Sequence, residues 1–300
     1  MTRALLITNP AAARTAHASL AAVAGILQGG GWSVEAHVTG GTGDARRFAE
    51  QAVAEDYDIV TVFGGDGTTM QAAAALVGTE TSLGIIPGGT GNLLAGNLRI
   101  PTSPVQAAKA LLRARPMLLD LGRVERADGT HYFAVACGAG YDARVMAETP
   151  GPDKQRWGMG AYVATTFRLL SQLKSVRQLI TVDGIERETT AAIVLVANCR
   201  EVIPPYIQLR SGISPSDGLL DLLTLRADSL MDGVRAVWDL LRERDHFDGE
   251  PGYVGYARGE EIRVESDPAQ PVEMDGEAQG HTPVTVTVVP GAIAVMAPPP

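Results

Sequence analysis

Residues 62–76 read VFGGDGTTMQAAAAL, in which an apolar segment is followed by glycines around one carboxylate and then by strong helix formers. This order predicts a buried strand, a tight turn over residues 64–68 and a helix that begins near Thr68. Glycines let backbone amides approach a ligand closely, and the N-terminus of a helix attracts anions. An ordinary strand-to-helix turn capped by Asp66 is the alternative that this segment alone leaves open.

The first 120 residues alternate short apolar segments with helical ones. Strands are predicted at Ala4–Thr8, Val34–Val38, Asp58–Phe63 and Leu83–Ile86, and helices at Ala16–Gln28, Asp44–Ala54 and Thr69–Val77. Strands that alternate with helices of about 10–15 residues indicate a parallel sheet with helices on its faces. We therefore expect an α/β domain over residues 1–120.

The pattern changes after residue 120, where strands predominate. They are predicted at Tyr132–Cys137, Gln178–Val182, Ala191–Ala197, Leu219–Leu225, Glu261–Glu265 and Val284–Val289, with helices near Met159–Leu173 and Leu230–Arg244. This pattern predicts a β-rich second domain over residues 121–289, arranged as a β-sandwich.

A second glycine-rich loop follows the next buried strand. Residues 83–97 read LGIIPGGTGNLLAGN, so a strand is again followed by a glycine turn and the start of a helix. Two neighbouring loops at the carboxyl ends of parallel strands can form the two sides of one nucleotide cleft. Thr90 and Asn92 offer a hydroxyl and an amide for phosphate oxygens or adenine.

Asp66 limits the ways in which this cleft could bind a phosphate. No G-x-x-x-x-G-K-[ST] sequence is present, so the loop is not the usual P-loop. A bare carboxylate would repel phosphate, unless Mg²⁺ or a basic residue stands between them.

Composition limits the partners and the compartment. The net charge of −9 argues against binding to nucleic acid, which depends on clustered Lys and Arg. Cys137 and Cys199 lie far apart in apolar segments and are expected to be buried thiols. The sequence shows neither a signal peptide nor an apolar stretch of about 18 residues, so we expect a cytoplasmic protein. A homodimer is left open.

Several motifs together resemble a known family. They are Asn9-Pro10, Gly64–Thr68, Pro87–Asn92, Gly138–Asp142 (GAGYD), Ser216–Asp221 (SDGLLD) and Asp275–Glu277 (DGE). In this order, over essentially the whole chain, they are similar to the diacylglycerol kinase catalytic-domain family, which includes sphingosine, ceramide and bacterial lipid kinases. The resemblance implies an α/β nucleotide-binding domain joined to a β-sandwich. It also implies that the last strand, Gly291–Ala297 within residues 290–300, returns to the first domain.

The resemblance also implies roles for individual residues. Those expected to bind ATP are Asn9, Gly64, Gly65, Asp66, Gly67, Thr68, Pro87, Gly88, Gly89, Thr90 and Asn92. Asp66 is implied to belong to the Mg²⁺ network, together with Arg14, although Ala12-Ala13-Arg14 departs from the usual Ser-Gly-Lys. Asp217 and Asp221 are implied to help hold a structural Mg²⁺.

Glu277 aligns with the general base of the family, and chemistry supports that role. A lipid hydroxyl must lose a proton as it attacks the γ-phosphorus of ATP, and a positioned carboxylate can accept that proton. The alternative is a simple hairpin turn of the Asp-Gly type, in which Asp275 is a hydrogen-bonding turn residue.

Three function classes follow. The leading one is an ATP-dependent lipid kinase that phosphorylates a hydroxyl of a lipid such as diacylglycerol or a sphingoid base. A kinase of a soluble metabolite, similar to NAD kinases, is disfavoured by the PGGTGN and DGE motifs. A non-catalytic lipid- or nucleotide-binding regulator is disfavoured by the presence of Asp66 and Glu277.

Residues 138–143 (GAGYDA) fit a dinucleotide fingerprint, but no βαβ unit follows them. Residues 202–207 (VIPPYI) stand where relatives often carry glycines beside the lipid site, which leaves the lipid open.

A membrane-resident substrate raises the question of access. Residues 151–178 combine five basic residues with Trp157, Tyr162 and several leucines. Such a helix could rest on an anionic bilayer as a peripheral contact. The alternative is a helix packed on the sandwich with a solvated basic edge.

Overall fold

The computed structural model describes residues 1–15, 17–140, 174–203, 207–209, 212–229, 231–232, 235 and 253–299. The helix expected near Met159–Leu173 and most of that expected at Leu230–Arg244 lie outside these residues, as do parts of the segments at 138–143 and 202–207. The chain divides into two units, described separately below. The first is Met1–Asp120, Ile203–Pro205 and Gly291–Pro300, and the second is Leu121–Val202 and Tyr206–Pro290.

The first unit contains a parallel sheet. In spatial order its strands are β2 (Ser33–Val38), β1 (Arg3–Thr8), β3 (Ile59–Gly64), β4 (Ser82–Pro87) and the end of β18 (Val284–Ala297). Every residue of β3 is buried, and so are nearly all residues of β1 and β4. Burial on both faces explains why these strands appear in the sequence as continuous apolar segments.

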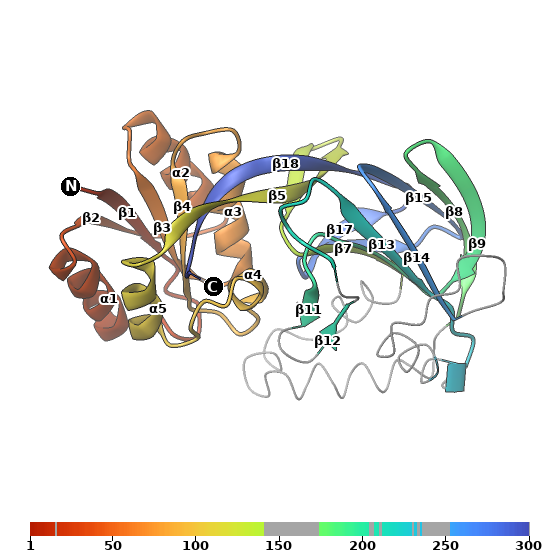
Figure 1. Cartoon of the computed structure of the whole chain (residues 1–300), viewed down its shortest axis with the longest axis horizontal. Coiled ribbons are helices and arrows are strands. Elements are labelled where there is room, and N and C mark those ends of the chain that lie inside the picture. The colour runs from red at the N-terminus through yellow and green to blue at the C-terminus, as the bar shows by residue number, and fades with distance from the viewer. Residues whose placement is uncertain are drawn as a thin grey trace. The chain divides into compact units, whose positions relative to one another are not determined.

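Helices lie on both sides of this sheet (Figure 1). They are α1 (His17–Gly29), α2 (Asp44–Ala54), α3 (Asp66–Leu76), α4 (Leu93–Asn97) and α5 (Pro104–Leu111). Helix α1 packs against α5, and α2 packs against α3. Ala49 and Ala52 of α2 and Ala72 and Ala73 of α3 are fully buried, and these small side chains let helices approach the sheet and each other closely. Among the described residues, none of the helices has the length and apolarity needed to cross a membrane.

The strand order creates a switch point between β1 and β3. The chain moves from β1 to β2 on one side, and from β3 to β4 on the other. In open parallel sheets, a crevice forms where the direction of winding reverses, beyond the carboxyl ends of the strands. The loops that begin at Asn9 and at Gly64 stand at this point.

The second unit contains two antiparallel sheets. One has the order β14 (Val254–Gly259), β13 (Leu220–Leu225), β10 (Ile193–Ala197), β7 (Ala136–Gly140), β16 (Pro271–Met274), β17 (Glu277–His281). The other has the order β18, β15 (Glu261–Asp267), β8 (Val176–Val182), β9 (Ile185–Ala191). On the other side of β18 lies β5 (Arg115–Arg126), which also pairs with β6 (Gly129–Phe133). A short pair, β11 (Glu201–Ile203) and β12 (Ile207–Gln208), is separate.

Side chains from both sheets form one core. Phe133, Val264 and Val286 from one sheet pack in the same buried cluster as Val196 and Leu222 from the other. This is a β-sandwich, so the expected fold class, an α/β parallel-sheet domain followed by a β-sandwich with a returning last strand, is confirmed.

Two predicted strands differ in the structure. The segment Tyr132–Cys137 is divided between β6 and β7, which belong to different sheets. At the division, the backbone N–H groups of Ala134, Val135 and Ala136 all donate to the carboxylate of Asp275. Conversely, the predicted strands Val284–Val289 and Gly291–Ala297 are one strand, β18.

The C-terminal end of the predicted membrane-contacting segment, beyond the helix expected near Met159–Leu173, is described by the structure. Residues from Val176 onward form β8, and the guanidinium of Arg177 pairs with Glu188 on β9, with Nε 2.8 Å from Oε1. Residues 151–173 of that segment lie outside the described residues.

Candidate active site

Three loops of the first unit meet at the switch point. Asn9, after β1, donates from its backbone N–H to the carbonyl of Phe63 (3.3 Å) and from Nδ2 to Oγ1 of Thr68 (3.1 Å). The N–H of Gly88, after β4, donates to the carbonyl of Gly64 (2.7 Å). The N–H of Arg14 donates in turn to the carbonyl of Gly88 (3.0 Å). The structure therefore brings the Asn9, GGDGT and PGGTGN segments together.

The two glycine loops pack backbone against backbone. A Cβ atom on Gly89 would lie 2.7 Å from Cα of Gly65. A Cβ atom on Gly88 would lie 2.8 Å from Cγ2 of Thr15 and 3.2 Å from Cα of Gly64. Neither glycine has a positive φ, so close approach, and not backbone strain, requires the absence of a side chain.

Asp66 connects the two loops. It is the first residue of α3, but its Oδ1 accepts a hydrogen bond from the N–H of Leu93, the first residue of α4 (2.7 Å). A Cβ atom on Gly91 would lie 2.8 Å from Oδ2 of Asp66, so the loop approaches this carboxylate closely. Asp66 therefore serves as a cap, although for the neighbouring helix and not for its own.

The surroundings of Asp66 shift its acidity. Burial raises the pKa of the Asp66 carboxyl, and hydrogen bonding to the backbone N–H groups around Leu93 opposes that rise. Burial makes the ionised form of Asp66 less favourable, and a cation bound beside the carboxylate would stabilise that form. Such a group is typical of functional clefts.

Two asparagines shape the loops with their side chains. Asn92 has a left-handed backbone (φ 51°), and its amide accepts from the N–H of Gly89 (2.9 Å) and donates to the carbonyl of Gly89 (2.7 Å). Oδ1 of Asn9 accepts from the N–H of Ala11 (3.0 Å). Both side-chain amides therefore bond to the backbone of their own loop. Thr90, which lies between Gly89 and Gly91, is exposed.

Arg14 and Thr15 end the first loop. The exposed Arg14 donates from Nη1 to the carbonyl of Thr102 (2.9 Å). The hydroxyl of the buried Thr15 lies 2.6 Å from the carbonyl oxygen of Asn9 and 2.9 Å from that of Ala12. The structural roles of Thr15 and Gly91 were missed in the sequence. Gly91 lies inside the PGGTGN motif and could have been included, but no pattern marked Thr15.

The DGE turn belongs to the second unit. Glu277 is the first residue of β17 and is exposed. The carboxylate of Asp275 accepts three hydrogen bonds, from the N–H groups of Ala134 (2.8 Å), Val135 (2.9 Å) and Ala136 (3.0 Å). Asp275 is therefore a hydrogen-bonding turn residue, as the sequence suggested, and it holds the turn that presents Glu277.

The carboxylates of Asp217 and Asp221 also come together in the second unit, where both bond to the same arginine. The guanidinium of Arg258 bonds to both carboxylates, and the hydroxyl of Tyr256 donates to Asp221. Burial raises the pKa of Asp221, while Tyr256 and Arg258 lower it. Over the part of the chain that the structure describes, no group of three or more His, Cys, Asp or Glu side chains could hold a metal ion. The structural Mg²⁺ stays a prediction, to which we return below.

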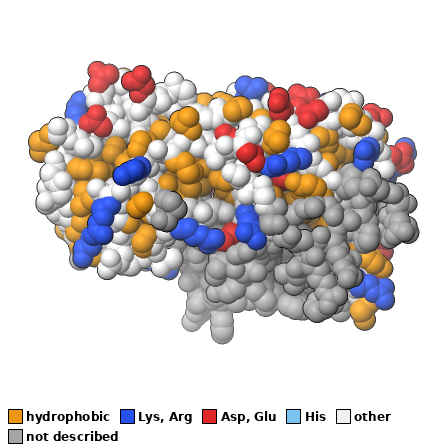
Figure 2. All heavy atoms as spheres, in the orientation of Figure 1, with side chains coloured by type: hydrophobic (Ala, Val, Ile, Leu, Met, Phe, Trp, Pro, Cys, Tyr) orange, Lys and Arg blue, Asp and Glu red, His pale blue; other side chains and the backbone are white. Residues whose placement is uncertain are grey.

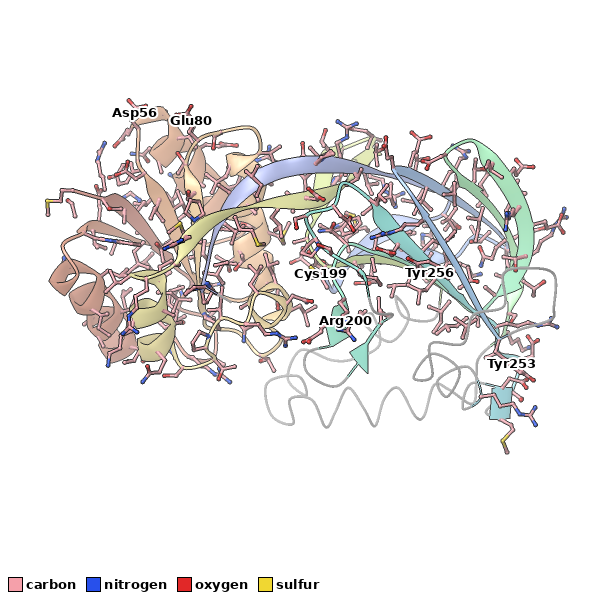
Figure 3. All side chains as sticks on the ribbon, viewed as in Figure 1. Asp56, Glu80, Cys199, Arg200, Tyr253 and Tyr256 are labelled. Atoms are coloured by element: carbon pink, nitrogen blue, oxygen red, sulfur yellow. The ribbon has the colours of Figure 1, made fainter. Side chains whose placement is uncertain are left out.

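The two cysteines belong neither to the loops around Asp66 nor to the DGE turn. Cys137 and Cys199 (Cys199 is labelled in Figure 3) are free and buried, and burial raises the pKa of both thiols. Neither is a thiolate nucleophile at neutral pH.

The sequence matches known proteins over both units. Residues 3–124 match the family described as diacylglycerol kinase catalytic domain, and residues 135–297 match the YegS C-terminal NAD kinase beta sandwich-like domain. A diacylglycerol kinase from Mycobacterium tuberculosis is 31% identical over 303 aligned residues, which cover 97% of this chain and 94% of that protein. The chain belongs to the diacylglycerol kinase catalytic-domain family.

Two further relatives match at lower identity. A diacylglycerol kinase from Bacillus subtilis is 27% identical over 289 residues, covering 94% of this chain and 92% of that protein. The chain spans 57% of a longer uncharacterised protein from Synechocystis, to which it is 28% identical.

Solved structures show the same fold. One from Bacillus anthracis superposes with a TM-score of 0.82 at 25% identity, over 99% of this chain and 95% of that one. A diacylglycerol kinase from the same organism superposes with a TM-score of 0.76 at 22% identity, over 99% and 97% of the two chains. The combination of an α/β unit and a β-sandwich is therefore shared within the family.

Proposed function

We propose that this chain is an ATP-dependent lipid kinase, which transfers the γ-phosphate of ATP to a hydroxyl of a lipid such as diacylglycerol or a sphingoid base. One observation carries the proposal. The GGDGT and PGGTGN loops meet at the switch point of a parallel sheet, and the carboxylate of Asp66 joins them. Membership of the diacylglycerol kinase family supports the lipid as acceptor.

The residues of the first unit fit a nucleotide. The glycines at 64–65 and 88–89 carry no side chains that would keep a phosphate away from the backbone amides of these loops. Helix α3 directs its positive N-terminal end toward the same loops. Asp66 would hold Mg²⁺, directly or through water, and Arg14 would contribute positive charge toward the phosphates. Mg²⁺ when bound would supply electrostatic stabilisation to the transferring phosphate.

Glu277 supplies the base in this proposal. Its exposed carboxylate accepts the proton of the lipid hydroxyl as the hydroxyl oxygen forms a bond to the γ-phosphorus. The bond from the γ-phosphorus to the bridging oxygen breaks, and ADP leaves with that electron pair. Asp275 keeps the turn in place through its three backbone hydrogen bonds.

Access to a membrane lipid requires peripheral contact in this proposal, with the chain acting on the cytoplasmic face. Figure 2 shows one face of the molecule, on which basic side chains lie singly or in small groups among acidic and hydrophobic ones. Binding to vesicles with and without anionic lipid measures this contact directly.

One assay tests the proposed function against the other function classes. The full chain is incubated with γ-labelled ATP, Mg²⁺ and a panel of lipid alcohols in mixed micelles, and with NAD in a separate reaction. Label in a lipid that depends on Asp66 supports the proposal. Label in NAD without lipid identifies a kinase of a soluble metabolite. Nucleotide or lipid binding without any labelled product identifies a non-catalytic regulator, and either result overturns the proposal.

A further inference from the structure

Two carboxylates for which the family resemblance implied a structural Mg²⁺, Asp217 and Asp221, both bond to an arginine in the second unit. Arg258 on β14 donates from Nη2 to Oδ2 of Asp217, and its Nε lies 3.1 Å from Oδ1 of Asp221. The same Nη2 lies 3.3 Å from the carbonyl oxygen of Gly212. Two carboxylates and a backbone carbonyl are the ligands that divalent cations such as Mg²⁺ and Ca²⁺ prefer. Here they surround a guanidinium.

The strand register places this arginine. Asp221 on β13 lies directly opposite Arg258 on β14 in the antiparallel ladder. Tyr256 lies two residues earlier on β14 (Figure 3), so it shares a face of the strand with Arg258, and its hydroxyl donates to Oδ1 of Asp221. The Asp221 side chain is 0% exposed. The guanidinium is therefore the positive charge that compensates a fully buried carboxylate.

The same contacts hold a loop. The N–H of Leu219 donates to Oδ1 of Asp217 (3.2 Å), while Oδ2 of Asp217 is bound by Arg258. Gly218 between them has a positive φ of 76° and packs near the ring of Pro290, 4.0 Å from its Cγ to a Cβ built on the glycine. Arg258 thus fastens the turn at 217–219 to strands β13 and β14.

A divalent cation and this guanidinium exclude each other. Mg²⁺ needs about six oxygens at roughly 2.0–2.1 Å, and the carboxylates would have to leave Arg258 to provide them. A displaced guanidinium beside a dication would then experience strong repulsion at short range. The residues present therefore do not fit a metal ion while Arg258 is in place.

We infer that Arg258 replaces the structural divalent cation in this chain, so that the turn at 217–219 is held to β13 and β14 without metal. The inference concerns stability and is independent of the proposed catalytic function. It predicts that the nucleotide-free protein is insensitive to chelation, and that removal of Arg258 creates a cation site.

The wild-type protein provides the first test. Nucleotide-free protein is dialysed against EDTA, analysed for bound metal and melted in EDTA, Mg²⁺ or Ca²⁺. We expect the same melting temperature in all three conditions and no bound metal that depends on Asp217. One equivalent of metal per chain that is lost in Asp217→Asn, or an EDTA-induced fall in melting temperature that Asp217→Asn abolishes, overturns the inference.

Arg258→Met provides the second test. We expect a melting temperature several degrees lower in EDTA, and a saturable recovery as Ca²⁺ or Mg²⁺ is added at millimolar concentration, because the cation then gains both carboxylates. The double variant Arg258→Met/Asp217→Asn should lose that recovery. Arg258→Gln, which keeps a donor for Asp217 but removes the charge, gives the same metal response if the Met variant does not fold.

Arg263→Met is the matched control. Arg263 on β15 also pairs with a carboxylate, Glu265, with Nε 2.8 Å from Oε1, but both side chains are about half exposed. Its loss should neither lower the melting temperature appreciably nor introduce a response to metal. A folded Arg258→Met or Arg258→Gln variant whose melting temperature is indifferent to Ca²⁺ and Mg²⁺ overturns the inference.

Discussion

At the scale of single residues, the Asp66 carboxylate combines a structural and a chemical role. Its Oδ1 caps α4 through the N–H of Leu93, and an asparagine oxygen can do the same. Its negative charge cannot be replaced by an amide. The two roles can therefore be separated by comparing Asp66→Asn with Asp66→Ala.

Asp66→Asn should lower phosphoryl transfer by about two orders of magnitude or more, as the loss of single transition-state contacts does. Because burial raises the pKa of Asp66 in the folded state, its ionised form opposes folding above that pKa. The opposition fades as the pH falls through the raised folded pKa toward the unfolded value of about 3.9.

Asp66→Asn should therefore be at least as stable as the wild type at neutral pH, and lose this advantage in acid. Asp66→Ala, which leaves the N–H of Leu93 without its acceptor, should be less stable than Asp66→Asn. Denaturation curves at several pH values and turnover at saturating Mg²⁺ measure both effects. Unchanged turnover in Asp66→Asn rejects the chemical role.

Glu277 is proposed to act as a base and forms no part of the ATP loops. Glu277→Gln should lower turnover by about 10²–10⁴-fold and leave the affinity for ATP unchanged. Glu186→Gln, at an exposed position on β9 in the same unit, should alter neither quantity. A loss confined to ATP binding would place Glu277 in the nucleotide site instead.

At the scale of elements, the two glycine loops depend on their mutual contact. Gly89→Ala places a Cβ atom 2.7 Å from Cα of Gly65, so the loops must separate. We expect a loss of about 1–3 kcal/mol in unfolding free energy and a rise in KM for ATP. Gly25→Ala in α1, where a Cβ atom would meet nothing within 4 Å, should leave activity unchanged and stability equal or higher.

The turn that carries Glu277 depends on Asp275 in a comparable way. Asp275→Ala leaves the N–H groups of residues 134–136 without their acceptor, which costs about 1–3 kcal/mol for each unsatisfied buried group. We expect kcat to fall while KM for ATP stays constant, because only the position of Glu277 changes.

Asp183→Ala is the control for that prediction. Asp183 has the same left-handed φ of 48° as Asp275, and its carboxylate accepts from the N–H groups of Glu260 (2.9 Å) and Glu261 (2.8 Å). Its loss should lower stability but leave kcat unchanged. An equal fall of kcat in both variants would show that Asp275 acts only through general stability.

At the scale of the whole molecule, the last strand belongs to both units. Strand β18 pairs antiparallel with β15 over Val284–Thr287 and parallel with β4 at Val295. The N–H of Gly291 on β18 donates to Oδ1 of Asp120 on β5 (2.7 Å). Each of these residues is the one at which its strand passes from one unit to the other. The C-terminal end of β18 thus adds a strand to the parallel sheet of the first unit.

Val295→Ala tests this dependence. Val295 is fully buried against the parallel sheet, so the substitution should lower the unfolding free energy by about 1–3 kcal/mol and reduce ATP binding at elevated temperature. Val105→Ala at a partly exposed helix position, where the side chain is 37% exposed, should change stability by less than about 0.5 kcal/mol. Chemical denaturation at neutral pH compares the two.

Much of this architecture could be predicted from the order of residues. The buried strands β1, β3 and β4 appear as apolar segments because both faces of the sheet are covered, and glycine-rich loops mark their carboxyl ends. The motifs and the family resemblance then led to the ATP loops, to Glu277 and to the two units. Strand β5 was missed because its burial is irregular along its length, and β6 and β7 were merged because an uninterrupted apolar segment conceals a change of sheet.

The tertiary structure alone decided which distant partners meet. Asp66 bonds to Leu93, 27 residues away, Asp275 bonds to Ala134, 141 residues away, and Asp221 faces Arg258 across a ladder. Local periodicity records whether a side chain is buried, because burial follows the repeat of its own strand or helix. The partner of a buried carboxylate depends on sheet order and strand register, which are set by the packing of the whole chain. For that reason the sequence determined where carboxylates and glycines would matter, and the fold determined what each of them holds.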